Sequence, residues 1–169
     1  MKLPFLMRRN ERDEPLVVSM TGARLGEKIL YAGSAPVFFM PLAARVGLSG
    51  QTTLVAPNAD DLKRAAERDG LLVDALAAPP PAGDYDLAVL EARGPWIDDL
   101  SRLRATVRPG GRIIVIAGQP RGLLARFRPP IEPPPSDDAI VRALAVEGWT
   151  RARGIGGQGG IRFVEAFNR

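Results

Sequence analysis

A short apolar segment that ends in a glycine turn constrains the fold of this chain more than any other feature. Residues 28–36 read Lys-Ile-Leu-Tyr-Ala-Gly-Ser-Ala-Pro, which predicts a buried strand, a tight turn at Gly33 and the start of a helix. The same order of apolar strand, turn and helix repeats down the chain. This alternation is typical of a parallel sheet with helices on both faces. In such a sheet, the turn after the first strand is where a ligand usually binds.

Seven strands and five helical segments are predicted. The strands are expected at 28–32, 52–55, 71–75, 85–90, 112–117, 149–153 and 161–167. The helices are expected at 15–20, within 36–46, and at 59–69, 96–107 and 136–147. Pro41 lies inside the second helix, so that helix either starts late, near Met40, or is kinked.

The predicted fold class is α/β: a doubly wound, mostly parallel seven-stranded sheet that ends in an antiparallel hairpin. Residues 108–111 (Arg-Pro-Gly-Gly) are expected to form a sharp turn before the fifth strand. The glycine-rich segment 154–160 is expected to be a flexible connection between the last two strands. This segment looks like a phosphate-binding loop, but it has no Lys and no helix after it.

The chain of 169 residues is long enough for one domain with a real core and short for two. We expect an N-terminal arm and lead-in helix over 1–26 and a single domain over 27–169. Within that domain, the Pro- and Arg-rich segment 119–135 is expected to be an insertion or lid. Residues 1–9 are apolar and then basic, which favours a docking arm or frayed end, with contact to a membrane surface as the alternative. This order does not match a signal peptide, and no apolar run reaches the length of a membrane span, so a cytoplasmic location is expected.

The composition excludes several kinds of chemistry. The chain has no Cys and no His, so disulfides, thiolate nucleophiles and the commonest neutral-pH base are absent, and no metal site is expected. Its net charge of +4, from 23 basic and 19 acidic residues, is too small to indicate nucleic-acid binding. No nucleophile and base pair stands out, and the sequence assigns no catalytic residue.

Three segments together resemble the Rossmann-like (class I) S-adenosylmethionine-dependent methyltransferases. They are Ile-Leu-Tyr-Ala-Gly-Ser-Ala-Pro-Val at 29–37, Tyr-Asp-Leu-Ala-Val-Leu-Glu-Ala at 85–92 and Leu-Arg-Ala-Thr-Val-Arg-Pro-Gly-Gly-Arg-Ile-Ile-Val-Ile-Ala-Gly at 103–118. The third segment is the most specific match, because it is similar to the family's helix, Pro-Gly-Gly turn and strand. The resemblance covers the chain from about Glu14 to Phe167.

The resemblance implies S-adenosylmethionine as the cofactor and a small molecule as the substrate. In the family, a glycine-rich turn approaches the methionine part, an acid after the second strand binds the ribose, and an acid after the third strand binds the adenine amine. The positions that match this pattern are Gly33, Ser34, Ala35, Ala56, Asn58, Asp74, Ala75 and Glu91. Glu91, just after the fourth strand, is either a polar group facing the substrate or a solvated loop acid.

The chain departs from the family pattern at two of its three cofactor-binding elements, the glycine-rich turn and the acid after the second strand. Tyr31 stands where the first strand usually has an acid, and Ala35 and Val37 stand where further glycines are expected. Ala56 stands where the ribose-binding acid is expected, while Asp74 remains as the candidate adenine acid. Since a charged hydrogen bond contributes roughly 1.5–3 kcal/mol, losing the ribose carboxylate alone weakens binding about ten- to a hundredfold.

Two functional hypotheses follow. The first is a methyltransferase-like protein acting on a small molecule, with weakened or lost cofactor binding, in which Phe38 and Phe39 could fill the vacated space. The second is a non-catalytic module that uses the same fold to bind a protein partner. A nicotinamide-dependent enzyme is disfavoured, because the Gly-x-Gly-x-x-Gly motif is absent.

Overall fold

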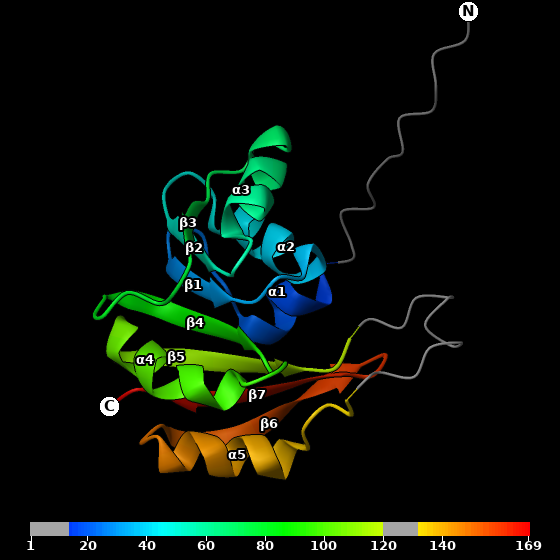
Figure 1. Ribbon diagram of the computed structural model, residues 1–169, viewed down its shortest axis with the longest axis vertical. Helices are drawn as coiled ribbons and strands as arrows, with labels where there is room; N and C mark the ends of the chain where they lie inside the picture. Colours follow the sequence, from blue (N-terminus) through cyan, green and yellow to red (C-terminus); the bar gives the residue numbers. More distant parts are fainter. Residues whose placement is uncertain (1–13, 120–131) are drawn as a thin grey trace, which may run out of the picture.

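A single seven-stranded sheet forms the centre of the molecule. The computed structural model describes residues 14–119 and 132–169. The strand order is β3-β2-β1-β4-β5-β7-β6, which Figure 1 shows from one edge of the sheet to the other. The pairs from β3 through β5 are parallel, and β7 pairs antiparallel with both β5 and β6. The predicted fold class, including the C-terminal antiparallel hairpin, is therefore confirmed.

The strands and helices alternate as the sequence predicts. The strands are β1 (Lys28–Ala32), β2 (Gln51–Val55), β3 (Asp74–Leu76), β4 (Tyr85–Glu91), β5 (Val107–Ala117), β6 (Thr150–Gln158) and β7 (Ile161–Phe167). The helices are α1 (Leu16–Thr21), α2 (Pro36–Val46), α3 (Ala59–Arg68), η1 (Trp96–Asp99), α4 (Leu100–Thr106) and α5 (Asp137–Val146). No helix lies between β3 and β4, which are joined by the proline-rich segment 77–84.

Helices cover both faces of the sheet and create two apolar cores. One core joins α1, α2 and α3 to the face that carries Ile29 and Tyr31 of β1. The other core joins η1, α4 and α5 to the face that carries Leu30 and Ala32. Since successive side chains of a strand point to opposite faces, β1 supplies both cores from alternate residues. All four of these residues are buried.

The second helix fills the whole predicted range of 36–46. α2 begins at Pro36 and continues through Pro41, so, of the two alternatives, the late start near Met40 is wrong. Pro36 occupies the first turn, where its missing N–H has no helical partner to lose. Pro41 leaves the carbonyl of Val37 without its helical donor, and Val37 is exposed, so water can bind there.

The bounds of β5 and β3 also differ from the prediction. β5 begins at Val107, so residues 108–111 belong to an irregular strand instead of a turn. Gly110 and Gly111 of this segment exchange backbone hydrogen bonds with Asn168 at 2.7 and 2.9 Å, which ties it to the end of the chain. The third strand lies at 74–76 and not at 71–75. Its short length reflects the single neighbour with which it pairs, β2.

The glycine-rich segment is mostly strand and not a flexible connection. β6 continues to Gln158 and pairs with β7, which leaves only Gly159 and Gly160 for the turn. A Cβ atom added to Gly157 would lie 2.9 Å from the Cα of Arg162. The glycine therefore permits a close approach of the two backbones that a larger residue would prevent.

Two predicted features fall largely on residues outside the described part. The N-terminal arm lies mainly in residues 1–13, and only its lead-in helix is seen, as α1. The expected insertion or lid at 119–135 lies mainly in residues 120–131. The helix after it begins as predicted, because the Ser136 hydroxyl accepts a hydrogen bond from the Ala139 N–H at 3.2 Å.

Candidate functional site

The turn between β1 and α2 lies at the carboxyl edge of the sheet. The N–H of Gly33 donates to the carbonyl of Val55 at 3.1 Å, so the turn stays attached to the neighbouring strand β2. Ala35 is the residue before the helix, and its side chain cannot cap the first turn. The carbonyl of Ala35 accepts the N–H of Phe38 at 3.0 Å, which begins the helix. Pro36 has no N–H and the Phe38 N–H is already used, so the Ala35 N–H, just before the helix, is the donor that meets an acceptor here.

The acceptor in this structure is the carboxylate of Glu91, the last residue of β4. Glu91 Oε1 accepts a hydrogen bond from the Ala35 N–H at 2.8 Å. The same oxygen accepts a hydrogen bond from the phenol of Tyr31 in the middle of the sheet. A carboxylate at a helix N-terminus is favourable, because the backbone dipoles point their positive ends toward it. Glu91 therefore caps α2 from a different strand.

Strand register explains why Glu91 reaches this turn. Tyr31 pairs with Val89 and Ala32 pairs with Leu90 in the parallel β1–β4 ladder. One further step places Glu91 beside Gly33. Because side chains alternate along a strand, Glu91 shares the face that carries Val89, which is also the face of Tyr31 and α2.

The Glu91 side chain fills the space above Gly33. A Cβ atom added to Gly33 would lie only 2.6 Å from Glu91 Cγ, which is closer than any real Cβ contact. The Glu91 side chain is 3% exposed. The glycine thus makes room for a carboxylate of the same chain. In this structure no space is left there for a ligand to approach the backbone.

The charge of Glu91 is only partly matched. Arg93 Nε lies 3.3 Å from Glu91 Oε2, and the Arg93 side chain is 40% exposed. The pair lacks the alignment of a hydrogen bond, and Oε2 is buried without a hydrogen-bond partner among the described residues. Burial raises the pKa of the Tyr31 phenol well above its ordinary value of 10.0, and the Glu91 charge and hydrogen bond raise it further, while Arg93 opposes them. Tyr31 is therefore a neutral donor to Glu91.

The aromatic residues of the second helix lie beside this pair. Phe38 and Phe39 are both buried, and the ring of Phe39 is 5.9 Å from that of Tyr31. The expectation that Tyr31 is a buried sheet residue is confirmed. Glu91, by contrast, is a buried strand residue, so its interpretation as a solvated loop acid is wrong.

The other residues predicted for the cofactor site, at 34, 35, 56 and 58, provide few polar side chains near the turn. Ser34 is exposed and Ala35 is half-buried. Ala56 is buried after β2, and its N–H donates to the carbonyl of Leu76 at 3.2 Å. Asn58 is exposed at the start of α3, and its side chain makes no cap hydrogen bond. The residues directly after β2, at 56–58, include no acid.

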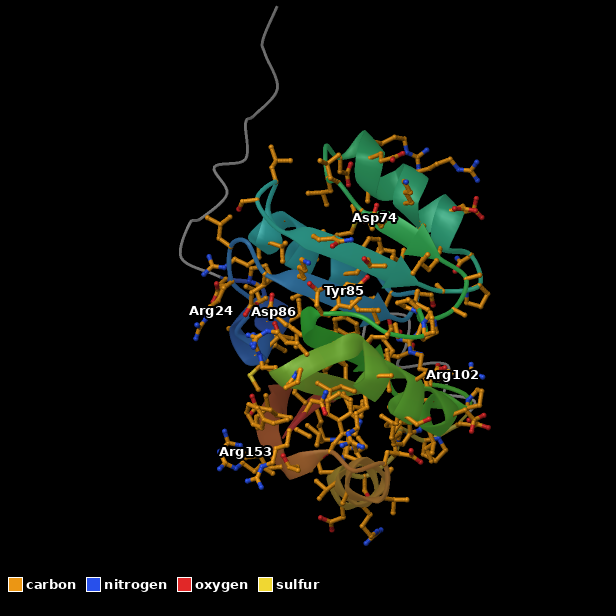
Figure 2. The ribbon with its side chains drawn as sticks, turned by 90° about the vertical axis from the view of Figure 1, so that its left-hand side faces the viewer. Arg24, Asp74, Tyr85, Asp86, Arg102 and Arg153 are labelled. Carbon is orange, nitrogen blue, oxygen red and sulfur yellow. The ribbon has the colours of Figure 1, made fainter. Side chains whose placement is uncertain are left out.

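Asp74 lies at the wrong end of its strand for the role expected of it. It is the first residue of β3 and pairs with Thr53 in the middle of β2. Its carboxylate accepts a hydrogen bond from the Gln51 side chain at 2.9 Å, at the amino end of β2. Figure 2 shows Asp74 on the edge of the sheet opposite to Arg153 of β6. Ala75 follows as a half-buried residue that packs on the core, and β3 ends at Leu76.

Sequence reasoning missed the contact between Tyr31 and Glu91. The signal was present, since a tyrosine replaces the expected acid of the first strand and an acid ends the fourth. These strands are neighbours in the observed sheet, so β4 can supply a carboxylate that β1 does not carry.

The comparisons with solved structures identify the fold. A SAM-dependent methyltransferase from Aquifex aeolicus superposes with a TM-score of 0.73 at 19% identity, covering 93% of this chain and 90% of that one. A SAM-dependent O-methyltransferase from Thermotoga maritima gives 0.62 at 13% identity, covering 99% of this chain and 67% of that one. Human N-acetylserotonin methyltransferase, in complex with SAM, gives 0.63 at 14% identity, covering 90% and 50%. The chain has the fold of the SAM-dependent methyltransferases.

Of the three comparisons with known proteins, only the one with solved structures finds this fold. No protein-family model matches the sequence, and a search of curated proteins finds no match. The chain spans 90% of the Aquifex protein but only half of the human enzyme, and other neighbours are also about twice its length. Within residues 14–119 and 132–169, no helix is long and apolar enough to cross a membrane.

The residues present do not fit the whole cofactor in this conformation. Glu91 occupies the approach to Gly33, Ala56 offers no carboxylate after β2, and Leu76 ends β3 with an apolar side chain. In the part of the chain that is described, no group of three potential metal ligands comes together.

Proposed function

We propose that this chain is a methyltransferase-fold protein for a small molecule in which binding of S-adenosylmethionine is weakened or lost. The observation that carries the proposal is the Glu91 carboxylate, which is hydrogen bonded to Ala35 and lies across Gly33. A ligand that approaches this turn has to displace Glu91. The missing acid after β2 supports the same conclusion, because the ribose hydroxyls lose their charged acceptor.

The size of the effect follows from the contacts that Glu91 would lose. Displacement breaks two hydrogen bonds to a charged group, one from Tyr31 and one from Ala35. At about 1.5–3 kcal/mol each, the two bonds together oppose cofactor binding by roughly 3–6 kcal/mol. That range corresponds to about two to four powers of ten in Kd. A micromolar affinity would move toward the millimolar range or beyond it.

Substrate class and location belong to the same proposal. The small-molecule methyl acceptor is supported by neighbours such as the enzyme named for N-acetylserotonin. A cytoplasmic location is proposed from the sequence. Gly33, Ser34, Ala35, Ala56, Asn58 and Glu91 remain the candidate residues of the cofactor site, and Asp74 and Ala75 stay candidates only for its adenine end.

The test is a calorimetric titration of the purified chain with S-adenosylhomocysteine up to millimolar concentration. We expect no saturation for the wild type, and binding at least about tenfold tighter for Glu91→Ala, which opens the turn. Glu165→Ala is the matched control, because Glu165 of β7 is another largely buried acid with an arginine partner, Arg153 of β6. It should leave binding unchanged. Wild-type binding at tens of micromolar or tighter would overturn the proposal.

The alternative function is a non-catalytic module that binds a protein partner. A hollow of about 370 Å³ between the proline loop and α4 favours it, lined by Pro79, Pro80, Pro81, Ser101, Arg102 and Ala105. Figure 2 shows Arg102 on the face of the molecule that carries α4. Failure of both the wild type and Glu91→Ala to bind S-adenosylhomocysteine would favour this alternative, since opening the turn would then restore no cofactor site.

A further inference from the structure

Glu91 presents one satisfied and one unsatisfied oxygen at the same turn. Oε1 accepts hydrogen bonds from Tyr31 and from the Ala35 N–H. Oε2 is buried, has no hydrogen-bond partner among the described residues and lies 3.3 Å from Arg93 Nε in an ion pair. A buried carboxylate oxygen without a donor is unusual, because leaving such a group unpaired is unfavourable. Oε2 is therefore a carboxylate oxygen that still lacks a hydrogen-bond donor, closed to solvent and paired only with the charge of Arg93 among the described residues.

The same carboxylate has already taken the position that an anion would occupy. The N-terminus of α2 attracts negative charge through its dipole. In this chain the Ala35 N–H is used by Glu91 and is not available to a ligand. A ligand carboxylate at this turn would either compete with Glu91 for the N–H or lie next to it with the same sign of charge. Both are unfavourable, whereas an ammonium group would be attracted.

We propose that the turn selects adenosine thioethers that carry an amine without a carboxylate, because Glu91 supplies the carboxylate from the protein. This selectivity rests on the proposed function, since it assumes that the adenosine end still binds along the carboxyl edge of the sheet. Glu91 Oε2 would accept the hydrogen bond of the ligand amine, and Oε1 would stay on Ala35 and Tyr31.

Three probes separate the charges of the ligand. S-adenosylhomocysteine carries an ammonium and a carboxylate, decarboxylated S-adenosylhomocysteine carries the ammonium alone, and methylthioadenosine carries neither. Their dissociation constants are measured by calorimetry on the wild-type chain and on Glu91→Gln, which keeps the size of the side chain and removes its charge. We expect the decarboxylated probe to bind the wild type at least about tenfold tighter than S-adenosylhomocysteine, with methylthioadenosine between them.

In Glu91→Gln the ratio between the decarboxylated probe and S-adenosylhomocysteine should fall to less than about threefold. Arg93→Gln provides a second variant at a more exposed position. It removes the positive partner of Glu91, so the same ratio should rise above the wild-type value. The ratio of the two dissociation constants should thus fall in Glu91→Gln and rise in Arg93→Gln. A general loss of stability would not move this ratio in opposite directions.

Equal binding of the two probes by the wild type, or a tenfold preference that survives in Glu91→Gln, overturns the inference. Absence of binding of the decarboxylated probe by the wild type up to millimolar concentration also overturns it. Different results would overturn the proposed function. These are tight binding of S-adenosylhomocysteine by the wild type, or no binding of S-adenosylhomocysteine by Glu91→Ala.

Discussion

Replacing Tyr31 by phenylalanine removes one donor to the buried carboxylate and little else. Tyr31 is fully buried, and its ring packs against Phe39 at a centroid distance of 5.9 Å. Phenylalanine keeps this packing, so the change isolates the hydrogen bond from the phenol to Glu91. The Glu91 carboxylate then has only the Ala35 N–H as hydrogen-bond donor, together with the Arg93 ion pair.

The expected loss of stability follows from the charge of the acceptor. A hydrogen bond to a charged group contributes about 1.5–3 kcal/mol, against about 0.5–1.5 kcal/mol for a neutral pair. Tyr31→Phe should therefore lower the free energy of unfolding by about 1.5–3 kcal/mol. For a domain of this size, that corresponds to a decrease in Tm of roughly 3–12 °C.

The chain contains its own control for this substitution. Tyr85 is also buried, and its phenol donates to the neutral hydroxyl of Thr53 at 2.9 Å. Tyr85→Phe should cost about 0.5–1.5 kcal/mol, less than Tyr31→Phe. Urea denaturation at pH 7, followed by circular dichroism, measures both variants against the wild type. Equal losses for the two variants, or a loss below about 0.5 kcal/mol for Tyr31→Phe, would refute the reasoning.

The pKa of Tyr31 adds a dependence on pH to this comparison. Burial first, and then the Glu91 charge and hydrogen bond, raise the pKa of the folded phenol well above 10.0, with Arg93 opposing. A group whose pKa is raised by folding contributes fully to the free energy of unfolding at pH values below its pKa in the unfolded chain. This contribution is lost as the pH rises toward its pKa in the folded protein. Above about pH 10 the difference between wild type and Tyr31→Phe should shrink by about 1.4 kcal/mol per pH unit. A constant difference across that range would contradict the assigned burial.

Three further predictions follow from named contacts. Gly33→Ala should cost about 1–3 kcal/mol, because its Cβ would lie 2.6 Å from Glu91 Cγ, and the cost should fall in the Glu91→Ala background, as a double-mutant cycle would measure. Burial raises the pKa of Asp86, but hydrogen bonds from the Lys28 N–H and the Arg108 side chain outweigh burial, so the pKa is lowered in the folded protein. The charged Asp86 therefore stabilises the fold above about pH 4, and this contribution to the free energy of unfolding is lost at lower pH. Asp86→Asn should therefore flatten the acid limb of the stability curve in denaturation experiments between about pH 2 and 6. Asp74→Ala should change the free energy of unfolding by less than about 0.5 kcal/mol, as urea denaturation would show.

The arrangement of the sheet was predictable because each strand carries its own local signal. The segment at 161–167 is rich in apolar residues, which are buried in both cores, and its predicted bounds match β7. The segment at 28–32 is apolar and precedes a glycine, and it also matches its strand, β1. The order of strands then follows from the connections, since α/β units and a terminal hairpin allow few topologies.

The errors occur where distant backbone contacts override the local signal. Residues 108–111 look like a turn, but hydrogen bonds with Asn168 hold them in line with β5. The glycines of β6 look flexible, yet pairing with β7 extends them. In the candidate site, the sequence pointed to the positions of Gly33 and Glu91 and not to their contact, which depends on the register between β1 and β4.

The measurement that tests the closed turn most directly is the amide resonance of Ala35 in an NMR titration with S-adenosylhomocysteine. If the Glu91 carboxylate holds this N–H, the resonance should lie downfield in the wild type, should move upfield in Glu91→Ala, and should shift with added ligand only in the variant. The Gly33 amide, which donates to Val55, is an internal reference for the neighbouring turn. A wild-type Ala35 resonance that resembles the variant and shifts at micromolar ligand would show that Glu91 does not close the site.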